Sequence, residues 1–241
     1  MGIAENLAEV RRRIDEACAA AGRDPAEVRL LPVSKTKPPA AIQEAYDAGI
    51  RLFGENKVQE AVAKAEVFAD LPELRWAVIG HLQTNKAKQV AAIAAEFHAL
   101  DSLRVATALD RRLRELGRTL DVFVQVNSSG EESKFGLRPE EVPAFARELE
   151  QFETLRVRGL MTLAVFSDDV DLVGACFARM RDLQARLQDS HDHPRWWREL
   201  SMGMSGDYEL AIGYGATTVR VGQAIFGNRL NPTDYWPASK R

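Results

Sequence analysis

The sequence has few cysteines, little net charge and no long apolar run, and each shortage excludes a class of protein. Its two cysteines, Cys18 and Cys176, lie far apart in apolar helical contexts. Such a pair is neither a disulfide framework nor a zinc-ligand spacing, and it suits a reducing compartment. The formal net charge is −3. No overall positive field therefore exists to recruit nucleic acid or an anionic membrane.

Long apolar runs are missing throughout the chain. No uninterrupted apolar stretch approaches the ~20 residues of a membrane-spanning helix. The first residues, MGIAENLAEVRRRIDEACAAAG, carry charges throughout and lack the apolar centre of a signal peptide. We therefore expect a cytoplasmic protein that binds neither membrane nor nucleic acid.

What the chain does have is a regular alternation of short apolar stretches and helical patterns. Apolar residues recur at helical spacing from Ile3 to Cys18, which predicts an N-terminal helix that ends at Gly22. Stretches rich in Ala, Glu and Arg, with helical periodicity, separate the strands that follow. The predicted strands span residues 29–34, 51–55, 75–80, 96–101, 121–127, 156–163, 198–204 and 217–227.

This alternation predicts an α/β fold with a parallel sheet, because strands that alternate with helices pair through right-handed crossovers. Eight such units within 241 residues match a single (β/α)8 TIM barrel. A doubly wound open sheet is the alternative, but Lys-Thr-Lys-Pro after the first strand does not fit its glycine-rich turn. No linker or repeat divides the chain. We expect one domain over residues 1–241, with a helix over 1–22 packing on the barrel and a short tail over 228–241.

Polar residues follow most of the predicted strands. In a TIM barrel the functional face is the end where the strands finish, so these side chains are expected at one mouth. A barrel without a functional site would also have polar residues where strands meet loops. The whole set therefore indicates a functional site more strongly than any one member does. The set comprises Lys35, Glu55, Asn56, His81, Asp101, Ser102, Asn127, Thr162, Ser201, Ser205 and Arg220.

The segments after the seventh and eighth strands indicate a phosphate site. The segment LSMGMSGD supplies two hydroxyls and two glycines, with Ser205 in an N-cap-like position. Gly222 lies late in the last predicted strand, where a glycine implies that some group approaches the backbone closely. Hydroxyls and free N–H groups at this place suit a small phosphomonoester. An ordinary turn and cap is the alternative.

Lys35 ends the apolar strand of LLPVSKTKP. A lysine amine becomes nucleophilic only where its neutral form is favoured, as at a desolvated barrel mouth. Together with a phosphate site it predicts a phosphorylated carbonyl compound held as a Schiff base, either a sugar phosphate in an aldolase or pyridoxal 5′-phosphate. Arg220 helps to separate the two, because a permanently charged guanidinium facing a pyridine nitrogen keeps that nitrogen unprotonated. A surface lysine with a packed stem is the alternative for Lys35.

Six segments resemble, in order and spacing, the pyridoxal phosphate homeostasis protein family, also called the proline synthase co-transcribed homolog family. They are LLPVSKTKP, FGENKVQE, WAVIGHLQTNK, RGLMTL, LSMGMSGDYELAI and TTVRVGQAIFG, and they cover about residues 28–228. The resemblance implies a fold type III barrel like the N-terminal domain of bacterial alanine racemases. It also implies pyridoxal 5′-phosphate bound covalently, as a Schiff base, to Lys35.

The resemblance further implies cofactor contacts for seven other residues. Arg220 would face the pyridine nitrogen, and Asn56 and Met202 would line the ring. The phosphate would be held by the hydroxyls of two serines and by the backbone of the last strand end. These residues are Ser201, Ser205, Gly222 and Gln223. One position departs from the family, which usually has His after the aromatic residue of the third-strand segment, where this chain has Trp76-Ala77.

The sequence offers no obvious second acid/base, which a racemase needs opposite its lysine. Tyr46, Tyr208 and Tyr214 fall in predicted helices, and Tyr235 lies in the tail. The fourteen residues after Gly227 leave no room for the second domain that supplies such a tyrosine in fold relatives. We therefore expect a protein of intracellular cofactor homeostasis that stores, buffers or delivers pyridoxal phosphate, with no catalytic residues and no metal. A small racemase or lyase is the alternative, and the expected partners are apo-enzymes that take up the cofactor, with the protein a monomer or weak dimer.

Overall fold

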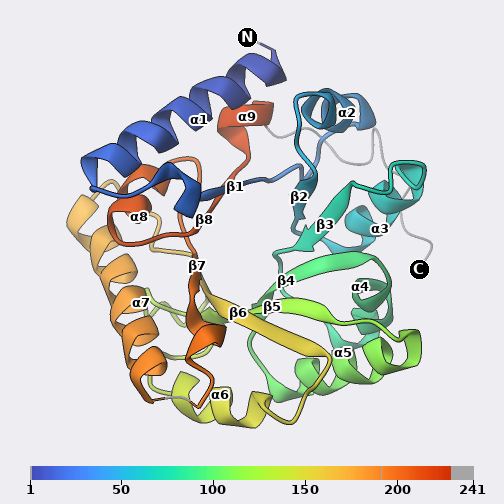
Figure 1. Cartoon of the computed structure of the whole chain (residues 1–241), viewed down its shortest axis with the longest axis vertical. Coiled ribbons are helices and arrows are strands. Elements are labelled where there is room, and N and C mark those ends of the chain that lie inside the picture. Colours follow the sequence, from blue (N-terminus) through green and yellow to red (C-terminus); the bar gives the residue numbers. More distant parts are fainter. Residues whose placement is uncertain (1, 191, 229–241) are drawn as a thin grey trace.

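The eight strands form a nearly closed parallel barrel (Figure 1). The structure, a computed structural model, describes residues 2–190 and 192–228. The strands are β1 (Arg29–Pro32), β2 (Leu52–Glu55), β3 (Arg75–Val78), β4 (Ala94–Leu100), β5 (Leu120–Val126), β6 (Leu155–Thr162), β7 (Glu199–Ser201) and β8 (Thr218–Val221). They pair in the order β1-β8-β7-β6-β5-β4-β3-β2. A single bridge between Val33 and Gly54 joins β1 to β2, and the predicted (β/α)8 fold is confirmed.

Helices surround the barrel on its outer side (Figure 1). They are α1 (Ile3–Ala20), α2 (Pro39–Asp47), α3 (Val58–Val67), α4 (Ala87–Ile93), α5 (Leu103–Leu116), α6 (Val142–Leu149), α7 (Val170–Ser190), α8 (Tyr208–Gly213) and α9 (Gln223–Phe226). The extra N-terminal helix is α1, which packs along α8 and α9. Its Asn6 side chain donates to the carbonyl of Ile225, 2.9 Å away. No described helix is long and apolar enough to cross a membrane.

Local sequence explains the ends of these elements, and α5 shows how. Ser102 precedes the helix and its hydroxyl accepts from the N–H of Val105, which satisfies one of the free N–H groups of the first turn. Gly117 follows the helix with φ of 60°, a left-handed conformation that glycine adopts without steric cost. Between them, Val105, Ala106, Leu109 and Leu113 are buried at the spacing of one helix face.

The last predicted strand is wrong in its second half. The strand over 217–227 ends at Val221, and Gly222 is the N-cap of α9 rather than a residue inside a strand. The N–H groups of Ile225 and Phe226 both donate to the carbonyl of Gly222. Short apolar runs such as QAIF do not distinguish a strand from a buried helical turn, which explains the error. Tyr235 and the predicted tail beyond residue 228 lie outside the described residues.

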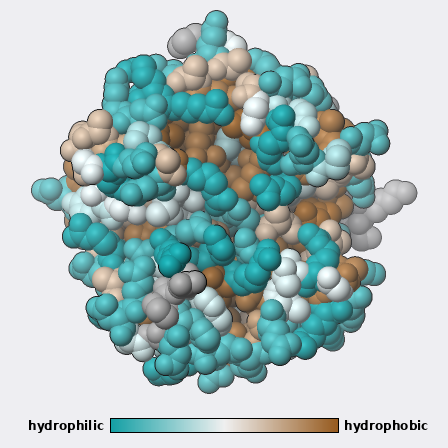
Figure 2. All heavy atoms as spheres, in the orientation of Figure 1, coloured by the Kyte–Doolittle hydropathy of each residue, from teal (hydrophilic) through white to brown (hydrophobic). Residues whose placement is uncertain are grey.

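The core lies between the strands and the surrounding helices. Phe53, Trp76, Phe97 and Phe177 are all nearly or fully buried there, whereas the buried Phe123 packs on the ring of His98, with centroids 4.1 Å apart. Hydrophilic side chains cover much of the visible face, and hydrophobic ones show mainly in a recess above its centre and on its right side (Figure 2). The barrel is therefore a packed scaffold whose strand ends can be held in fixed positions.

Two phenylalanines test how much of the stability comes from this core. Phe177 on α7 is 0% exposed, whereas Phe166 is 100% exposed. We expect Phe177→Ala to lower the free energy of unfolding by about 3–5 kcal/mol, because a large buried side chain leaves a cavity. Phe166→Ala is the matched control and should change it by less than about 0.5 kcal/mol. Urea unfolding followed by circular dichroism measures both, and equal effects would contradict this assignment of the core.

Candidate functional site

Four neighbouring strand ends lie together at one mouth of the barrel. The N–H of Val33, after β1, donates to the carbonyl of Val221 at 2.9 Å, and the N–H of Ser34 donates to Gly54 of β2 at 3.1 Å. The N–H of Arg220 donates to the carbonyl of Gly203, which follows β7, at 2.9 Å. Chain segments after β7, β8, β1 and β2 are thus consecutive neighbours around the ring.

The first of these segments is a tight turn that carries Lys35. The N–H of Lys37 donates to the carbonyl of Ser34 at 3.0 Å, which closes the turn around Lys35 and Thr36. Lys35 is half-buried. The ammonium of Lys37 donates to the carbonyls of Phe226, at 2.7 Å, and Gly227, at 3.1 Å. Burial lowers the pKa of Lys37, and its contacts fasten the turn to the end of α9.

The segment after β8 places Gly222 and Ser205 together beside this turn. The hydroxyl of Ser205 accepts from the N–H of Gly222 at 3.3 Å. A Cβ on Gly222 would lie 3.1 Å from the carbonyl oxygen of Val33, so glycine allows β8 and β1 to approach closely. The N–H groups of Gln223 and Ala224 precede the first intrahelical bonds of α9 and have no acceptor within that helix. Hydroxyl and N–H donors therefore gather at the strand end next to Lys35.

Ser205 is not the cap of the following helix, as its position in the sequence suggested. Asp207 is the N-cap of α8, and its carboxylate accepts from the N–H of Met204 at 2.5 Å. Burial raises the pKa of Asp207, against the lowering effect of the Met204 N–H. The Asp207 carboxylate thus occupies the turn, and this leaves the Ser205 hydroxyl to face Gly222.

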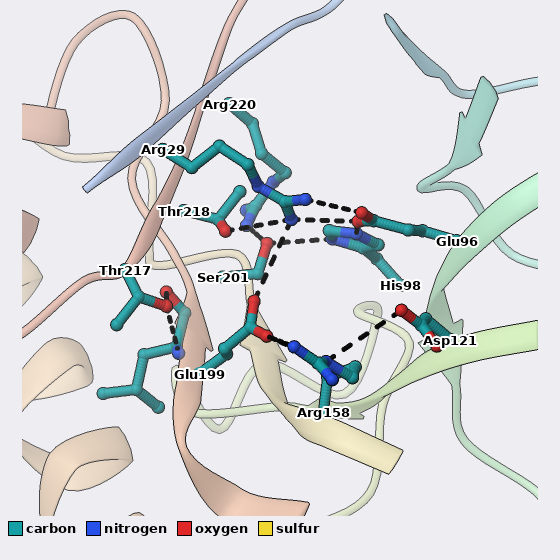
Figure 3. Close-up of polar contacts among 11 residues, drawn as sticks. Arg29, Glu96, His98, Asp121, Arg158, Glu199, Ser201, Thr217, Thr218 and Arg220 are labelled. Carbon is teal, nitrogen blue, oxygen red and sulfur yellow. Dashed lines mark hydrogen bonds and ion pairs between the residues drawn. The ribbon is translucent and has the colours of Figure 1, made fainter. Parts of the chain in front are cut away.

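Arg220 belongs to a chain of polar contacts inside the barrel (Figure 3). Its guanidinium donates to the hydroxyl of Ser201 at 2.8 Å and to the carbonyl of Thr162 at 2.7 Å. Ser201 lies 3.0 Å from Nδ1 of His98. Arg220 is 3% exposed, and Ser201, Thr162 and His98 are fully buried. Burial lowers the pKa of Arg220 to about 10, so the guanidinium remains charged at neutral pH.

These polar contacts continue to an ion pair between the buried Glu96 and the partly exposed Arg29. Nε2 of His98 lies 2.8 Å from a Glu96 oxygen, and Arg29 donates to both oxygens of that carboxylate, at 2.5 and 2.9 Å. Burial lowers the pKa of His98, so the neutral ring donates from Nε2 to Glu96 and accepts at Nδ1 from Ser201. The Ser201 oxygen is then left to accept from Arg220. Every contact in this series, from Arg29 to Arg220, has one donor and one acceptor, and this fixes the orientation of the Arg220 guanidinium.

Ser201 and Ser205, the two serines predicted to hold the phosphate, have different hydrogen-bond partners. The structure brings Ser201 to Arg220 and His98, whereas Ser205 lies with Gly222. Met202, which follows Ser201 in the sequence, is fully buried. Its N–H donates to the carbonyl of Thr218 at 3.1 Å. Six of the eight predicted binding residues thus fall into a Lys35 turn, a Ser205–Gly222 edge, an Arg220–Ser201 pair, and Asn56. The other two are the buried Met202 after β7 and Gln223, the first residue of α9.

Asn56 lies at the edge of a cavity that occupies another part of the mouth. The cavity has a volume of about 430 Å³ and is lined by residues that include Asn56, Lys57, His81, Lys86, Gln125 and Phe135. A Cβ on Gly80 would lie 2.0 Å from the carbonyl oxygen of Asn56, so only glycine permits this approach. Lys35 and Arg220 are not among its lining residues.

The other polar residues at strand ends have local roles. His81 stacks on Phe135, with ring centroids 4.0 Å apart, and lies 3.6 Å from Asp101. The Asn127 amide donates within its own loop, to the carbonyl of Glu131 at 2.8 Å. The Thr162 hydroxyl donates to the carbonyl of Val126 at 2.8 Å. Within the described residues, no group of three or more His, Cys, Asp or Glu side chains could hold a metal ion.

The three described tyrosines contact the outer layer. Arg51 lies over the ring of Tyr46 at 4.0 Å, and Arg13 lies over Tyr208 at 5.8 Å. Tyr214 packs against Phe177 of α7.

Ala77, at the position where the family usually has His, is fully buried in β3. It pairs in register with Gly54 and Glu96.

Several polar residues near the site were missed at the level of sequence. Glu96 and His98 stand two positions apart in a predicted buried strand, so both point to one face, and that pattern could have indicated an internal polar group. Glu60 and Lys64 stand four positions apart on a helix, which resembles an ordinary surface ion pair. The structure instead buries them beneath the Lys35 turn. Their partners are distant in the sequence, so spacing alone does not identify them.

Comparison with known proteins gives close relatives. A family model described as alanine racemase, N-terminal domain, matches residues 5–230. The pyridoxal phosphate homeostasis protein of Pseudomonas aeruginosa is 48% identical over 227 residues, which is 94% of this chain and 96% of that protein. The protein of the same name from Escherichia coli is 44% identical over 230 residues, or 94% and 97% of the two chains.

Solved structures give the same fold. PipY of Synechococcus elongatus, with pyridoxal phosphate bound, has a TM-score of 0.82 at 40% identity, covering 93% of this chain and 100% of that one. An alanine racemase from Clostridium difficile has a TM-score of 0.75 at 14% identity, over 99% of this chain and 58% of that one. The second match shows a shared fold alone.

The internal ion pair predicts a specific dependence of stability on pH. Burial raises the pKa of Glu96, but hydrogen bonds from His98 and Arg29 outweigh it and hold that pKa at about 2, below the ordinary value of 4.5. A carboxyl with a lowered pKa stabilises the fold above pH 4.5 and loses this contribution as the pH falls toward 2.

We expect Glu96→Gln to lower the free energy of unfolding at pH 6–7 by roughly 2–3 kcal/mol. The difference from the parent protein should shrink as the pH falls below about 4.5. Urea unfolding of both proteins between pH 3 and pH 7 measures it. A difference that stays constant with pH would contradict the pairing.

Proposed function

Since the chain belongs to the pyridoxal phosphate homeostasis protein family, we propose that it binds pyridoxal 5′-phosphate at the barrel mouth as a Schiff base on Lys35. In this proposal the protein stores, buffers or delivers the cofactor to apo-enzymes without substantial turnover. The names of its relatives support the role, and so does PipY, which was solved with pyridoxal phosphate bound. The observation that carries the proposal is the juxtaposition of Lys35, Gly222 with Ser205, and Arg220 on neighbouring strand ends.

The residues at the mouth fit the three parts of this ligand. When bound, pyridoxal phosphate supplies an aldehyde, an aromatic ring with a basic nitrogen, and a dianionic phosphate. The amine of Lys35 suits the aldehyde. The N–H of Gln223, the hydroxyl of Ser205 and the N–H of Gly222, which donates to that hydroxyl in this structure, suit the phosphate, since a phosphate needs several donors at once. Asn56 and Met202 are proposed along the ring.

The position of Arg220 supports a protein that holds the cofactor rather than one that uses it in catalysis. Its guanidinium is oriented by Ser201 and by the Thr162 carbonyl and stays charged at neutral pH. A fixed cation beside the pyridine nitrogen keeps that nitrogen unprotonated, and an unprotonated ring withdraws electrons weakly. The ring contacts of the described tyrosines are with Arg13, Arg51 and Phe177, and we assign none of these tyrosines as a second acid/base. A lysine that binds the cofactor, without a tyrosine assigned opposite it among the described residues, suits a carrier.

The absorbance spectrum tests the proposal directly. We expect protein mixed with pyridoxal phosphate to show a visible Schiff-base band that Lys35→Ala abolishes, because no other amine is proposed to hold the cofactor. Lys88→Ala, at an exposed position on α4, is the matched control and should keep the band. A protein that binds no cofactor would overturn the proposal. Substantial turnover of amino acids, lost in Lys35→Ala, would replace it with a racemase or lyase, and borohydride trapping of a sugar phosphate would indicate an aldolase.

The phosphate contact has its own test. We expect Ser205→Ala to weaken binding of pyridoxal phosphate by about three- to tenfold, since it removes one hydrogen bond to a charged group. Binding of pyridoxal, which has no phosphate, should change by less than twofold and serves as the control. Titrations of the Schiff-base band with each ligand measure both constants. Equal weakening for the two ligands would place Ser205 away from the phosphate.

A further inference from the structure

We propose that Lys64, Glu55 and Glu60 form a buried charge clamp that fixes the backbone on both sides of Lys35 and so positions its amine. This inference rests on the proposed function of Lys35. The three are positioning residues, since they act on the turn rather than on the cofactor. Two of them lie on α3, and Glu55 ends β2.

The clamp holds the residue before Lys35 through three contacts. The ammonium of Lys64 donates to the carbonyl of Ser34 at 2.7 Å and to Oε1 of Glu55 at 2.6 Å. The hydroxyl of Ser34 donates to the same Glu55 oxygen at 2.5 Å. Both the backbone and the side chain of Ser34 are therefore fixed against charged groups.

The clamp holds the residue after Lys35 through Glu60. Oε1 of Glu60 accepts from the N–H of Thr36 at 2.5 Å and lies 2.8 Å from the Lys64 ammonium. Thr36 has φ of 63°, and no other described residue except glycines has a positive φ. A β-branched residue rarely adopts this left-handed conformation, and such strain persists only where the surroundings impose it. Glu60 supplies that restraint at the residue next to the amine.

Burial makes the clamp rigid. The side chains of Lys64 and Glu55 are 0% exposed and that of Glu60 is 7% exposed. Charged hydrogen bonds out of water are strong, and loss of one partner leaves another charge unpaired. A buried ion cluster is nevertheless weak evidence for stability, because apolar residues often serve as well. These charged groups also form hydrogen bonds to Ser34 and Thr36, which apolar side chains could not do. The hydrogen bonds fix the backbone conformation of the turn.

Two substitutions of Glu60 separate positioning from packing. Glu60→Ala removes the acceptor of the Thr36 N–H, whereas Glu60→Gln keeps an oxygen that can accept from it. In protein free of cofactor, we expect Glu60→Ala to speed hydrogen exchange of the Thr36 amide by at least about tenfold. Cofactor affinity should fall by about tenfold or more, and Glu60→Gln should restore both to within about threefold of the parent protein.

Asp110→Ala is the matched control for loss of a hydrogen-bonded carboxylate. Asp110 on α5 accepts from the Thr154 hydroxyl at 2.7 Å and from Arg114 at 2.8 Å. The Asp110→Ala substitution should lower the melting temperature without changing the hydrogen-exchange rate of the Thr36 amide or the affinity for the cofactor. If Glu60→Ala gives only this pattern, the clamp is merely structural and the inference is overturned.

A milder variant keeps the inference testable if Glu60→Ala does not fold. Ser34→Ala removes one hydroxyl contact to Glu55 and should weaken cofactor binding in the same direction by about threefold. An affinity equal to that of the parent protein would count against the clamp. Failure of the parent protein to bind pyridoxal phosphate would overturn the proposed function instead. In that case the exchange rate of Thr36 still reports on the clamp.

Discussion

Charges that are removed from water must be paired, and this requirement determines how the strand ends of the barrel are arranged. Arg220, Lys64, Glu55 and Glu96 are all buried, and an unpaired charge in such a place would be severely destabilising. Each is therefore tied to partners on other strands or helices. Because these partners come from distant parts of the chain, the ion pairs and hydrogen bonds fix how the strand ends lie relative to one another. The positions of the functional groups follow from that arrangement.

Two such groups of charges flank the proposed cofactor site. On one side, Arg29, Glu96, His98 and Ser201 orient Arg220 from inside the barrel. On the other side, Glu55, Glu60 and Lys64 hold the turn around Lys35. The first group fixes the cation proposed for the pyridine nitrogen, and the second fixes the amine proposed for the aldehyde. Between them, the Ser205 hydroxyl and the Gly222 backbone lie together at the edge where β8 meets β1. A ligand with three different parts would thus meet three groups that are placed before it arrives.

Local patterns in the sequence were sufficient to predict the barrel and the position of Lys35. They could not predict contacts between residues that are far apart in the sequence. Periodicity identified the strands, and the rule that barrel strands end at the functional face brought Lys35 and Arg220 to one mouth. The pattern failed where an apolar run was ambiguous, as in α9, and where two polar residues competed for one role, as with Ser205 and Asp207. It also gave no sign that Ser201 turns inward to His98, which is 103 positions away in the sequence. Such pairings depend on the folded chain, so no spacing rule shows them.

Chemical reduction of the Schiff base shows whether Lys35 alone holds the cofactor. Protein loaded with pyridoxal phosphate is treated with borohydride, which makes a Schiff base permanent, and then digested and mapped by mass spectrometry. We expect a stoichiometric label on the peptide that contains Lys35. A label spread over exposed lysines, or found mainly on Lys37, Lys57 or Lys134, would contradict it.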